Sequence, residues 1–433
     1  MIDKKVIYEE VILDNIEKVK NIKIVKRDIN ISLLQNKIKA IYGVRRSGKT
    51  YFLFQIISSS YKDDFIYINF EDERLINITI DELNDFLKIA LSIKNTKNLF
   101  FDEIQNINNW ELFIRRLNDE GYNLFVTGSS SKLLSKEIAT SLRGRSLSRE
   151  IFPLNFKEFL KFNNIECNLQ LSTAEKSKML SYVNNFFKFG GFPELVFLND
   201  DLKKEILKEY LEGIFYRDIV ERYNIRNIKE LRVLRNILIN LYSNEISIKK
   251  ITFFLKEYNT KISRESIYTY MSYFEDAYLI FSLENFSYKS KIKPNSKLYV
   301  IDGAWNFSLS VDKNKGKILE NMVLLELRKY GFVENENLFY CKGRNYEVDF
   351  LIEREDGSQE LFQVCYELNE MNKEREFGAF KKAINDLKLK DTKLKIITHD
   401  DESFKRISIG NEEYIVEVIP FWKWCFLYNI DAQ

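Results

Sequence analysis

Residues 41–50 read IYGVRRSGKT, and the rest of the fold can be worked out from this stretch. Four residues separate Gly43 from Gly48, and Lys49 and Thr50 follow directly. The run before it, IKAIYGV (38–44), is short and apolar like a buried strand, whereas TYFLFQIISSSY after it has helical spacing. A strand, a glycine loop and a helix in this order predict a phosphate-binding loop.

In such a loop, backbone N–H groups and the positive end of the helix surround the phosphates. We expect Lys49 to reach the β- and γ-phosphates of ATP, and the Thr50 hydroxyl to bind Mg²⁺. Arg45 and Arg46 either steer phosphate or pair with acids at a subunit contact. The alternative is a glycine turn without a ligand. The residues predicted to contact ATP are Gly43, Val44, Arg45, Arg46, Ser47, Gly48, Lys49 and Thr50.

An acidic pair ends the apolar run NLFFDEIQ (98–105). After a phosphate-binding loop, such a pair is typical of the magnesium side of an ATPase site. We expect Asp102 to hold Mg²⁺ through water, and Glu103 to act as general base or to orient the attacking water. The alternative is a strand end whose acids face solvent.

Three further apolar runs complete a predicted parallel sheet: 64–70, 122–131 and 148–154. Thr127, at the end of the second of these, stands where a sensor of the γ-phosphate is expected, although an ordinary strand-to-helix turn explains it nearly as well. The fold class is therefore α/β, with a P-loop NTPase core. An acidic pair on one strand and a polar sensor on the next resemble the catalytic-glutamate division of these ATPases.

The stretch LRGR (142–145) carries Arg143 and Arg145 between the last two predicted strands. Either arginine could stabilise the phosphoryl group at the ATP site of a neighbouring subunit, as an arginine finger does. The active unit would then be a homo-oligomer. The alternative is a surface loop with two solvated arginines.

Further motifs follow one another along the chain: GVRRSGKT (43–50), FFDEIQ (100–105), VTGSS (126–130), LRGR (142–145), FPLNFKEFL (152–160), GGFPELV (190–196), YRDIVERY (216–223), YVIDGAW (299–305) and NYEVDFLI (345–352). In this order they resemble prokaryotic AAA-type ATPases that carry a C-terminal domain of unknown function with a restriction-endonuclease-like end. The resemblance covers nearly the whole chain. It implies ATP binding, oligomerisation and roles related to DNA or to defence.

The middle of the chain is expected to form a helical lid and then a winged helix. ISIKKITFFLKEYN (246–259) is amphipathic, Ser263 can cap a second helix, and two strand-like runs follow. In a winged helix the hairpin between these strands contacts DNA phosphates. The predicted DNA contacts are Arg264, Lys289, Lys291, Lys293 and Lys297. A winged helix that binds a protein is the alternative.

The last part of the chain is predicted to be an α/β domain like that of a restriction endonuclease. Such a site needs an Asp at the end of one strand and (D/E)-x-K on the next, to bind Mg²⁺ and activate water. Asp349 and the helix acid Glu320 fit, but Gln363 and Cys365 stand in place of the second acid and the lysine. We expect a degenerate site without nuclease activity, although Lys342 could supply the missing cation.

Composition limits the other functions. The chain has 433 residues, of which 45% are hydrophobic and 30% charged, with a net charge of +2, so only local patches could favour nucleic acid. Four scattered cysteines and one histidine argue against a zinc module and a histidine-based nucleophile. Without a long apolar run, we expect a cytoplasmic protein with no membrane contact.

These observations predict an oligomeric, Mg²⁺-dependent AAA-like ATPase that acts on a macromolecule, with DNA favoured. A nucleotide-gated switch or scaffold for a protein partner is one alternative, and an ATP-regulated nuclease is another. The expected parts are an N-terminal segment (1–35), the ATPase core (36–155), a helical lid (156–235), the winged helix (236–305) and the degenerate nuclease-like domain (306–433).

Overall fold

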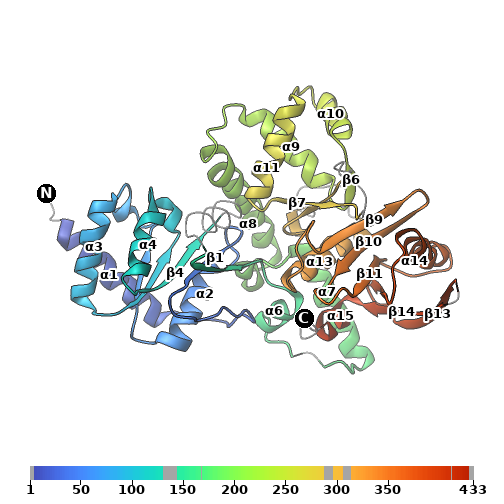
Figure 1. The fold of residues 1–433 in the computed structure, drawn as a ribbon, viewed down its shortest axis with the longest axis horizontal. Helices are drawn as coiled ribbons and strands as arrows, with labels where there is room; N and C mark the ends of the chain where they lie inside the picture. The colour runs from blue at the N-terminus through green and yellow to red at the C-terminus, as the bar shows by residue number, and fades with distance from the viewer. Residues whose placement is uncertain are drawn as a thin grey trace. The chain divides into compact units, whose positions relative to one another are not determined.

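The computed structural model of the protein describes residues 4–129, 144–166, 168–286, 296–305, 314–410 and 412–428. The chain divides into two compact units, Met1–Pro153 and Leu154–Gln433 (Figure 1). The five-part division predicted above is finer than this one and stays a prediction.

Unit 1 is built on a five-stranded parallel sheet with the strand order β2-β3-β4-β1-β5. The α/β fold class with a parallel P-loop-type sheet is therefore confirmed. The fifth strand begins and ends earlier than predicted. The strands are β1 (Ile38–Tyr42), β2 (Ile66–Asn69), β3 (Asn98–Asp102), β4 (Asn123–Gly128) and β5 (Ser146–Glu150).

Helices cover both faces of this sheet, because its strands are apolar on both sides. Residues of α1, α3 and α4 pack against one face, and residues of α2 and the π-helical turn that follows it pack against the other (Figure 1). The helices are α1 (Lys4–Asn21), α2 (Lys49–Ile56), the turn Ile57–Tyr61, α3 (Ile80–Ile93) and α4 (Trp110–Asp119). Short 3₁₀ turns cover Glu73–Leu75 and Ile104–Asn106.

Unit 2 begins with a group of helices. They are α6 (Phe156–Phe162), α7 (Thr173–Phe189), the 3₁₀ turn Pro193–Phe197, α8 (Asp200–Gly213) with its π-helical continuation Ile214–Glu221, and α9 (Ile228–Asn240). Capping boxes start α6 and α7, where Asn155 and Ser172 accept from the backbone N–H three residues on.

A small antiparallel sheet follows, with the strand order β6-β8-β7. Helices α10 and α11 stand between β6 and β7 in the chain; α10 contacts α9, α11 contacts β7, and α9 contacts β8 (Figure 1). The elements are β6 (Asn244–Ile246), α10 (Ile248–Glu257), α11 (Arg264–Asp276), β7 (Ile280–Glu284) and β8 (Ser296–Val300).

The last part of unit 2 is a six-stranded mixed sheet with the order β13-β14-β12-β11-β10-β9. Helix α14 contacts β10, β9 and β13, whereas α13 contacts β11. The elements are α13 (Lys315–Lys329), β9 (Leu338–Gly343), β10 (Tyr346–Glu353), β11 (Gln359–Val364), α14 (Lys373–Leu387), β12 (Lys393–Thr398), β13 (Ser403–Ile409), β14 (Glu412–Pro420) and α15 (Phe421–Leu427).

A glycine turn and a buried carboxylate join distant parts of unit 2. The carboxylate of Asp302 accepts hydrogen bonds from the backbone N–H groups of Gly191, at 2.8 Å, and Ala304, at 2.9 Å. Burial raises the pKa of Asp302 to about 6. Gly190 has φ 73° and ψ −161°, and a Cβ there would lie 1.9 Å from an oxygen of Asp302. Only glycine fits this position.

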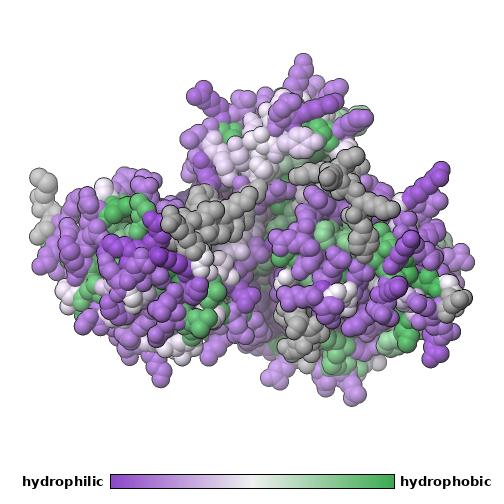
Figure 2. Space-filling model, in the orientation of Figure 1, coloured by the Kyte–Doolittle hydropathy of each residue, from purple (hydrophilic) through white to green (hydrophobic). Residues whose placement is uncertain are grey.

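Polar residues dominate the visible surface of each unit, and hydrophobic residues appear there in small separate groups (Figure 2). Among the residues placed by the structure, no helix combines the length and the apolar character that crossing a membrane requires.

The change Gly190→Ala tests this turn. We expect it to lower the free energy of unfolding by about 1–3 kcal/mol, because the new Cβ meets Asp302 and the backbone conformation excludes side chains. Urea unfolding followed by circular dichroism measures the change. Gly213→Ala is the matched control, since Gly213 is helical with no atom within 4 Å of an added Cβ. Equal stability of the two variants would contradict the account.

Candidate functional site

The loop between β1 and α2 is shaped by close packing and by positive φ angles. A Cβ on Gly43 would lie 2.1 Å from the carbonyl oxygen of Ile151, so the loop passes directly over the residue after β5. Arg46 has φ 69°, and Gly48 has φ 96° where it begins α2. The hydroxyl of Ser47 is buried without a hydrogen-bond partner. The loop thus leaves a polar group inside its curve, as a cradle for an anion does.

Lys49 lies in the first turn of α2 with its side chain buried. Its ammonium donates to the carbonyl oxygens of Gly43, at 3.2 Å, and Val44, at 3.1 Å. It also lies 3.7 Å from a carboxylate oxygen of Glu103. The ammonium of Lys49 therefore lies between the loop and Glu103, the acid that follows β3.

Asp102, at the end of β3, collects hydroxyl groups from neighbouring elements. Its Oδ2 atom accepts from the hydroxyls of Thr50, at 2.7 Å, and Tyr67, at 2.8 Å, while its Oδ1 atom accepts from Thr127. Thr50, Asp102 and Thr127 are predicted from the sequence to share one site, and the structure brings all three together.

Glu103 follows Asp102 in a left-handed backbone conformation, with φ 52°. Such conformations cost energy in residues other than glycine and are frequent at functional sites. Its backbone N–H donates to the Thr127 hydroxyl at 2.9 Å, and the amide of Gln105 donates to its carboxylate at 2.5 Å. Gln105 also reaches the hydroxyl of Ser129 at 3.4 Å, so the position of Glu103 is linked to the end of β4.

The two adjacent acids differ in their electrostatic surroundings. Burial and the charge of Glu103 raise the pKa of Asp102, and the hydroxyl groups around it only partly oppose this. Burial alone would also raise the pKa of Glu103. The ammonium of Lys49 and the amide of Gln105 outweigh burial and hold that pKa below its ordinary value. The pKa values of the two adjacent acids are therefore shifted in opposite directions, upward for Asp102 and downward for Glu103.

Arg27 supports the loop, although no motif in the sequence points to it. The residue is 6% exposed, and its guanidinium donates to the carbonyl oxygens of Ser47, at 2.8 Å, and Phe152, at 2.9 Å. The side chain of Gln55 on α2 forms hydrogen bonds with the backbone N–H and C=O of Arg27. No local pattern marks this residue, because its partners are distant in sequence.

The other predicted arginines have different surroundings. Arg45 pairs with Glu71 of the same chain at 2.7 Å. Arg145 pairs with Asp119 at 2.6 Å on the surface. Arg143 lies outside the described residues.

The residues of the predicted degenerate nuclease site lie together in unit 2. Glu320 on α13 and Asp349 on β10 contact the same ammonium group, that of Lys297. The carbonyl oxygen of the Gln363 amide accepts from the backbone N–H of Asp349 at 2.9 Å. Cys365 is buried, and burial raises the pKa of its thiol to about 11, so it supplies neither a cation nor a thiolate.

The predicted DNA contacts divide into three groups. Arg264 is exposed at the start of α11. Lys289, Lys291 and Lys293 lie outside the described residues. The predicted DNA contact of Lys297 is corrected by the structure. The side chain of Lys297 is 3% exposed and contacts carboxylates, so it does not face a phosphate backbone.

Three family matches cover most of the chain. Residues 35–160 match the AAA domain, residues 181–310 match a domain of unknown function, DUF8612, and residues 315–424 match another, DUF4143. A protein of Methanocaldococcus jannaschii, "Uncharacterized protein MJ1544", is 69% identical over 99% of this chain and 97% of its own length. The chain belongs to this family of AAA-domain P-loop ATPases. The predicted resemblance is confirmed.

Other similar proteins are more distant. An "Uncharacterized protein" of Haemophilus influenzae is 28% identical over 83% of this chain and 88% of its own length. Among solved structures, "The walker-type atpase paby2304 of pyrococcus abyssi" is 15% identical, with a TM-score of 0.42, and the match covers 71% of this chain and 96% of that one. The similarity of this AAA family member to its Haemophilus influenzae relative thus extends along most of both chains.

The change Arg27→Ala tests the support of the loop. It removes two buried hydrogen bonds from a charged donor, each worth about 1.5–3 kcal/mol, so the loop loses its fixed shape. We expect the affinity for a fluorescent ATP analogue to fall about tenfold or more in equilibrium titrations. The exposed neighbour Lys26, changed to Ala, is the control and should bind as the wild type does. Unchanged affinity in a folded Arg27→Ala variant would rule out this role.

Proposed function

We propose that this AAA family member binds ATP with Mg²⁺ in the loop 43–50 and hydrolyses it. The observation that carries the proposal is the 2.7 Å hydrogen bond between the Thr50 hydroxyl and Asp102, beside the 3.7 Å approach of Lys49 to Glu103. These four side chains are the ones a P-loop ATPase uses to hold phosphate, metal and water.

Thr50 and Asp102 fit a magnesium ion, which prefers hydroxyl, carboxylate and water oxygens. When bound, the ion would neutralise charge on the β- and γ-phosphates. Lys49 would exchange its loop carbonyl contacts for phosphate oxygens. The unpartnered hydroxyl of Ser47 supports the fit, because it leaves a donor free inside the loop.

Glu103 is the proposed base or orienting group for the attacking water. Its low pKa keeps it ionised, and Gln105 and the backbone contact with Thr127 fix its direction. Thr127, held between Asp102 and Glu103, is proposed to sense whether the γ-phosphate is present. Departure of the phosphate would then alter the hydrogen bonds at the ends of β3 and β4.

The change Glu103→Gln should keep ATP binding and abolish turnover. The amide preserves size but cannot accept a proton from water, so we expect kcat to fall by about 100-fold or more. Phosphate release measures turnover, and titration with a fluorescent ATP analogue measures binding.

The exposed Glu73, changed to Gln, is the matched control and should hydrolyse ATP at the wild-type rate. Normal hydrolysis by Glu103→Gln would remove this residue from the mechanism. Loss of binding together with turnover would show that it holds the nucleotide site together instead.

We further propose that the active form is a homo-oligomer in which Arg143 or Arg145 completes the neighbouring ATP site. The ion pair of Arg145 with Asp119 does not argue strongly against this role, because exposed pairs contribute only about 0–1 kcal/mol. Hydrolysis would then alter the contact between subunits and move the macromolecule that unit 2 binds.

DNA is the proposed target, and the small sheet of unit 2 supports it. The element order α9-β6-α10-α11-β7-β8, with β6 and β7 both paired to β8, supports the proposed winged helix. Its second helix, α11, exposes Arg264 and presents Tyr268 at 64% exposure. The connection after β7 carries Lys289, Lys291 and Lys293 in sequence, which suits contact with phosphates.

Neutralising Lys289, Lys291 and Lys293 together to Gln should weaken DNA binding by a similar factor for all sequences. Each lost phosphate contact should make the negative slope of log affinity against log salt shallower by about 0.9. For the triple variant we therefore expect the magnitude of this slope to fall by roughly two to three. Fluorescence anisotropy with labelled duplexes over a range of salt concentrations measures both quantities.

The matched control neutralises three exposed lysines near α14, namely Lys381, Lys388 and Lys390. It should leave the slope unchanged, because it removes the same charge from another surface. If the wild type binds no DNA even at low salt, the proposal of a DNA target fails. A nucleotide-gated switch or scaffold for a protein partner would then be favoured.

A further inference from the structure

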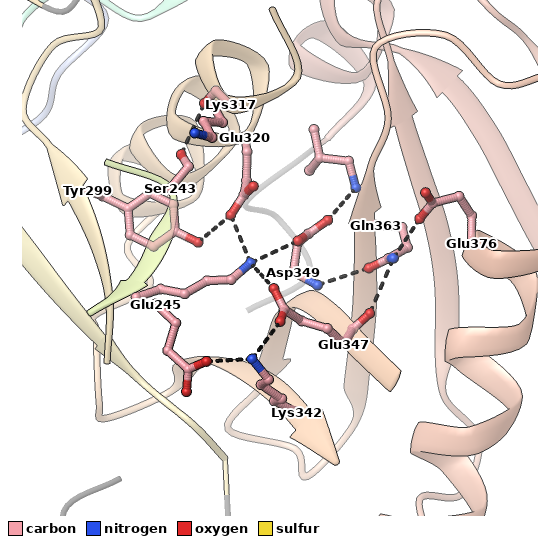
Figure 3. Close-up of polar contacts among 12 residues, drawn as sticks. Ser243, Glu245, Tyr299, Lys317, Glu320, Lys342, Glu347, Asp349, Gln363 and Glu376 are labelled. Carbon is pink, nitrogen blue, oxygen red and sulfur yellow. Dashed lines mark hydrogen bonds and ion pairs between the residues drawn. The ribbon is translucent and has the colours of Figure 1, made fainter. Parts of the chain in front are cut away.

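Three carboxylates of unit 2 converge on one ammonium group, that of Lys297. Its Nζ atom lies 2.8 Å from Glu347, 3.0 Å from Glu320 and 3.0 Å from Asp349. Figure 3 shows the three acids pointing from α13 and β10 toward the same point. Carboxylate oxygens are also the ligands that hard divalent cations prefer.

The lysine reaches this position from a different sheet. It lies on β8 of the three-stranded sheet, whereas Glu347 and Asp349 lie on β10 of the six-stranded sheet. Burial alone would lower the pKa of Lys297. The surrounding carboxylates, that of Glu320 first, outweigh burial and raise this pKa well above its ordinary value. With three ion pairs around it, the group in the centre of the site is an ammonium.

Contacts other than Lys297 also hold the carboxylates in place. The hydroxyl of Tyr299 donates to Glu320 at 2.7 Å, and the backbone N–H of Val364 donates to Asp349 at 2.9 Å. Lys342 lies 3.3 Å from the second oxygen of Glu347. The pairing of β9 with β10 is irregular between 348 and 351, as in the bulges that redirect side chains beside active sites.

The metal ion that a restriction-endonuclease-like fold implies does not fit this arrangement as it stands. The amide of Gln363 is fully engaged, since it accepts from the backbone of Asp349 and donates to Glu376 at 2.6 Å. In the part of the chain that the structure describes, no three histidine, cysteine or acidic side chains are arranged to hold a metal. The acids are spaced around an ammonium instead.

We propose that the ammonium of Lys297 takes the place of a divalent cation, and that Glu320, Glu347 and Asp349 become a Mg²⁺ or Mn²⁺ site when that ammonium is removed. The oxygens lie 2.8–3.0 Å from Nζ. A magnesium ion binds oxygen at about 2.1 Å, so each carboxylate needs to move inward by less than about 1 Å.

A cavity gives a cation access to the site. Its volume is about 490 Å³, and Glu320, Glu347 and Asp349 form part of its wall. Three carboxylates meet there, whereas the ammonium groups that contact them are those of Lys297 and Lys342. Without Lys297, the cluster would keep the ammonium of Lys342, which contacts Glu347 at the edge of the group rather than at its centre.

The competing explanation is a buried ion-pair cluster that only joins β8 to β10. Such clusters hold elements together without any relation to metals. The two explanations differ in what removal of the lysine does. A simple clamp leaves unpaired acids, whereas a replaced metal site gains affinity for cations.

The experiment titrates Mn²⁺ into the nucleotide-free full chain by isothermal calorimetry. It compares the wild type with Asp349→Asn, and Lys297→Ala with Lys297→Ala combined with Asp349→Asn. Mn²⁺ binding is assigned to the site around Asp349 only where Asp349→Asn abolishes it, because Thr50 and Asp102 can also offer oxygens to Mn²⁺. Lys342→Ala is the matched control, since it removes one positive charge from the same cluster without emptying its centre.

We expect Lys297→Ala to bind Mn²⁺ at least about tenfold more tightly than the wild type, the scale on which single groups alter metal affinity. Mn²⁺ should also raise the melting temperature of this variant and not that of the wild type. Lys342→Ala should resemble the wild type.

Three results would overturn the proposal: no Mn²⁺ binding by a folded Lys297→Ala variant, equally tight Asp349-dependent binding by the wild type, or an equal gain in Lys342→Ala. If Lys297→Ala does not fold, Lys297→Met keeps the apolar length of the side chain and serves in its place. The wild-type titration decides in any case, because tight Asp349-dependent binding there contradicts replacement by the ammonium. This outcome is independent of DNA binding and of ATP hydrolysis.

Discussion

The hydrogen bond from Thr50 to Asp102 depends on one constraint, the parallel direction of neighbouring strands. Strands β3, β4 and β1 are adjacent, so their carboxyl ends meet at one edge of the sheet. Asp102 ends β3, Thr127 lies near the end of β4, and Thr50 follows the loop after β1. Residues more than seventy positions apart therefore share one carboxylate. The low pKa of Glu103 follows, because the same edge brings Lys49 beside it.

The carboxylate contacts of Lys49 and Lys297 differ in how firmly they hold the ammonium group. Lys49 divides its ammonium between loop carbonyls and one carboxylate at 3.7 Å. Lys297 lies within 3.0 Å of three carboxylates. An incoming anion can therefore redirect the first lysine at low cost. Withdrawal of the second breaks three close ion pairs in a buried setting, which is far more costly.

Sequence spacing predicted most of the residues that meet in the proposed ATP site, because they stand at the ends of apolar strands and in one glycine loop. It also predicted the five strands of unit 1, with β5 displaced by a few residues. Arg27 could not be found in this way, since its contacts with Ser47 and Phe152 span 20 and 125 positions.

Lys297 was predicted to contact DNA because of its basic neighbours in sequence, and this part of the prediction was wrong. A signal for the correct placement was present in the alternation of β8, where Lys297 and Tyr299 stand two residues apart and so face the same side. Both side chains reach Glu320. What the sequence could not supply was the identity of the acids on that side, because they come from α13 and β10.

The guanidinium of Arg27 connects the loop 43–50 to the last residues of unit 1 through hydrogen bonds. It donates at once to Ser47 in the loop and to Phe152, one residue before unit 1 ends at Pro153. A displacement of the loop must therefore either break a buried hydrogen bond or carry Phe152 with it. A movement of the loop can therefore be passed through this one side chain to the last residues of unit 1.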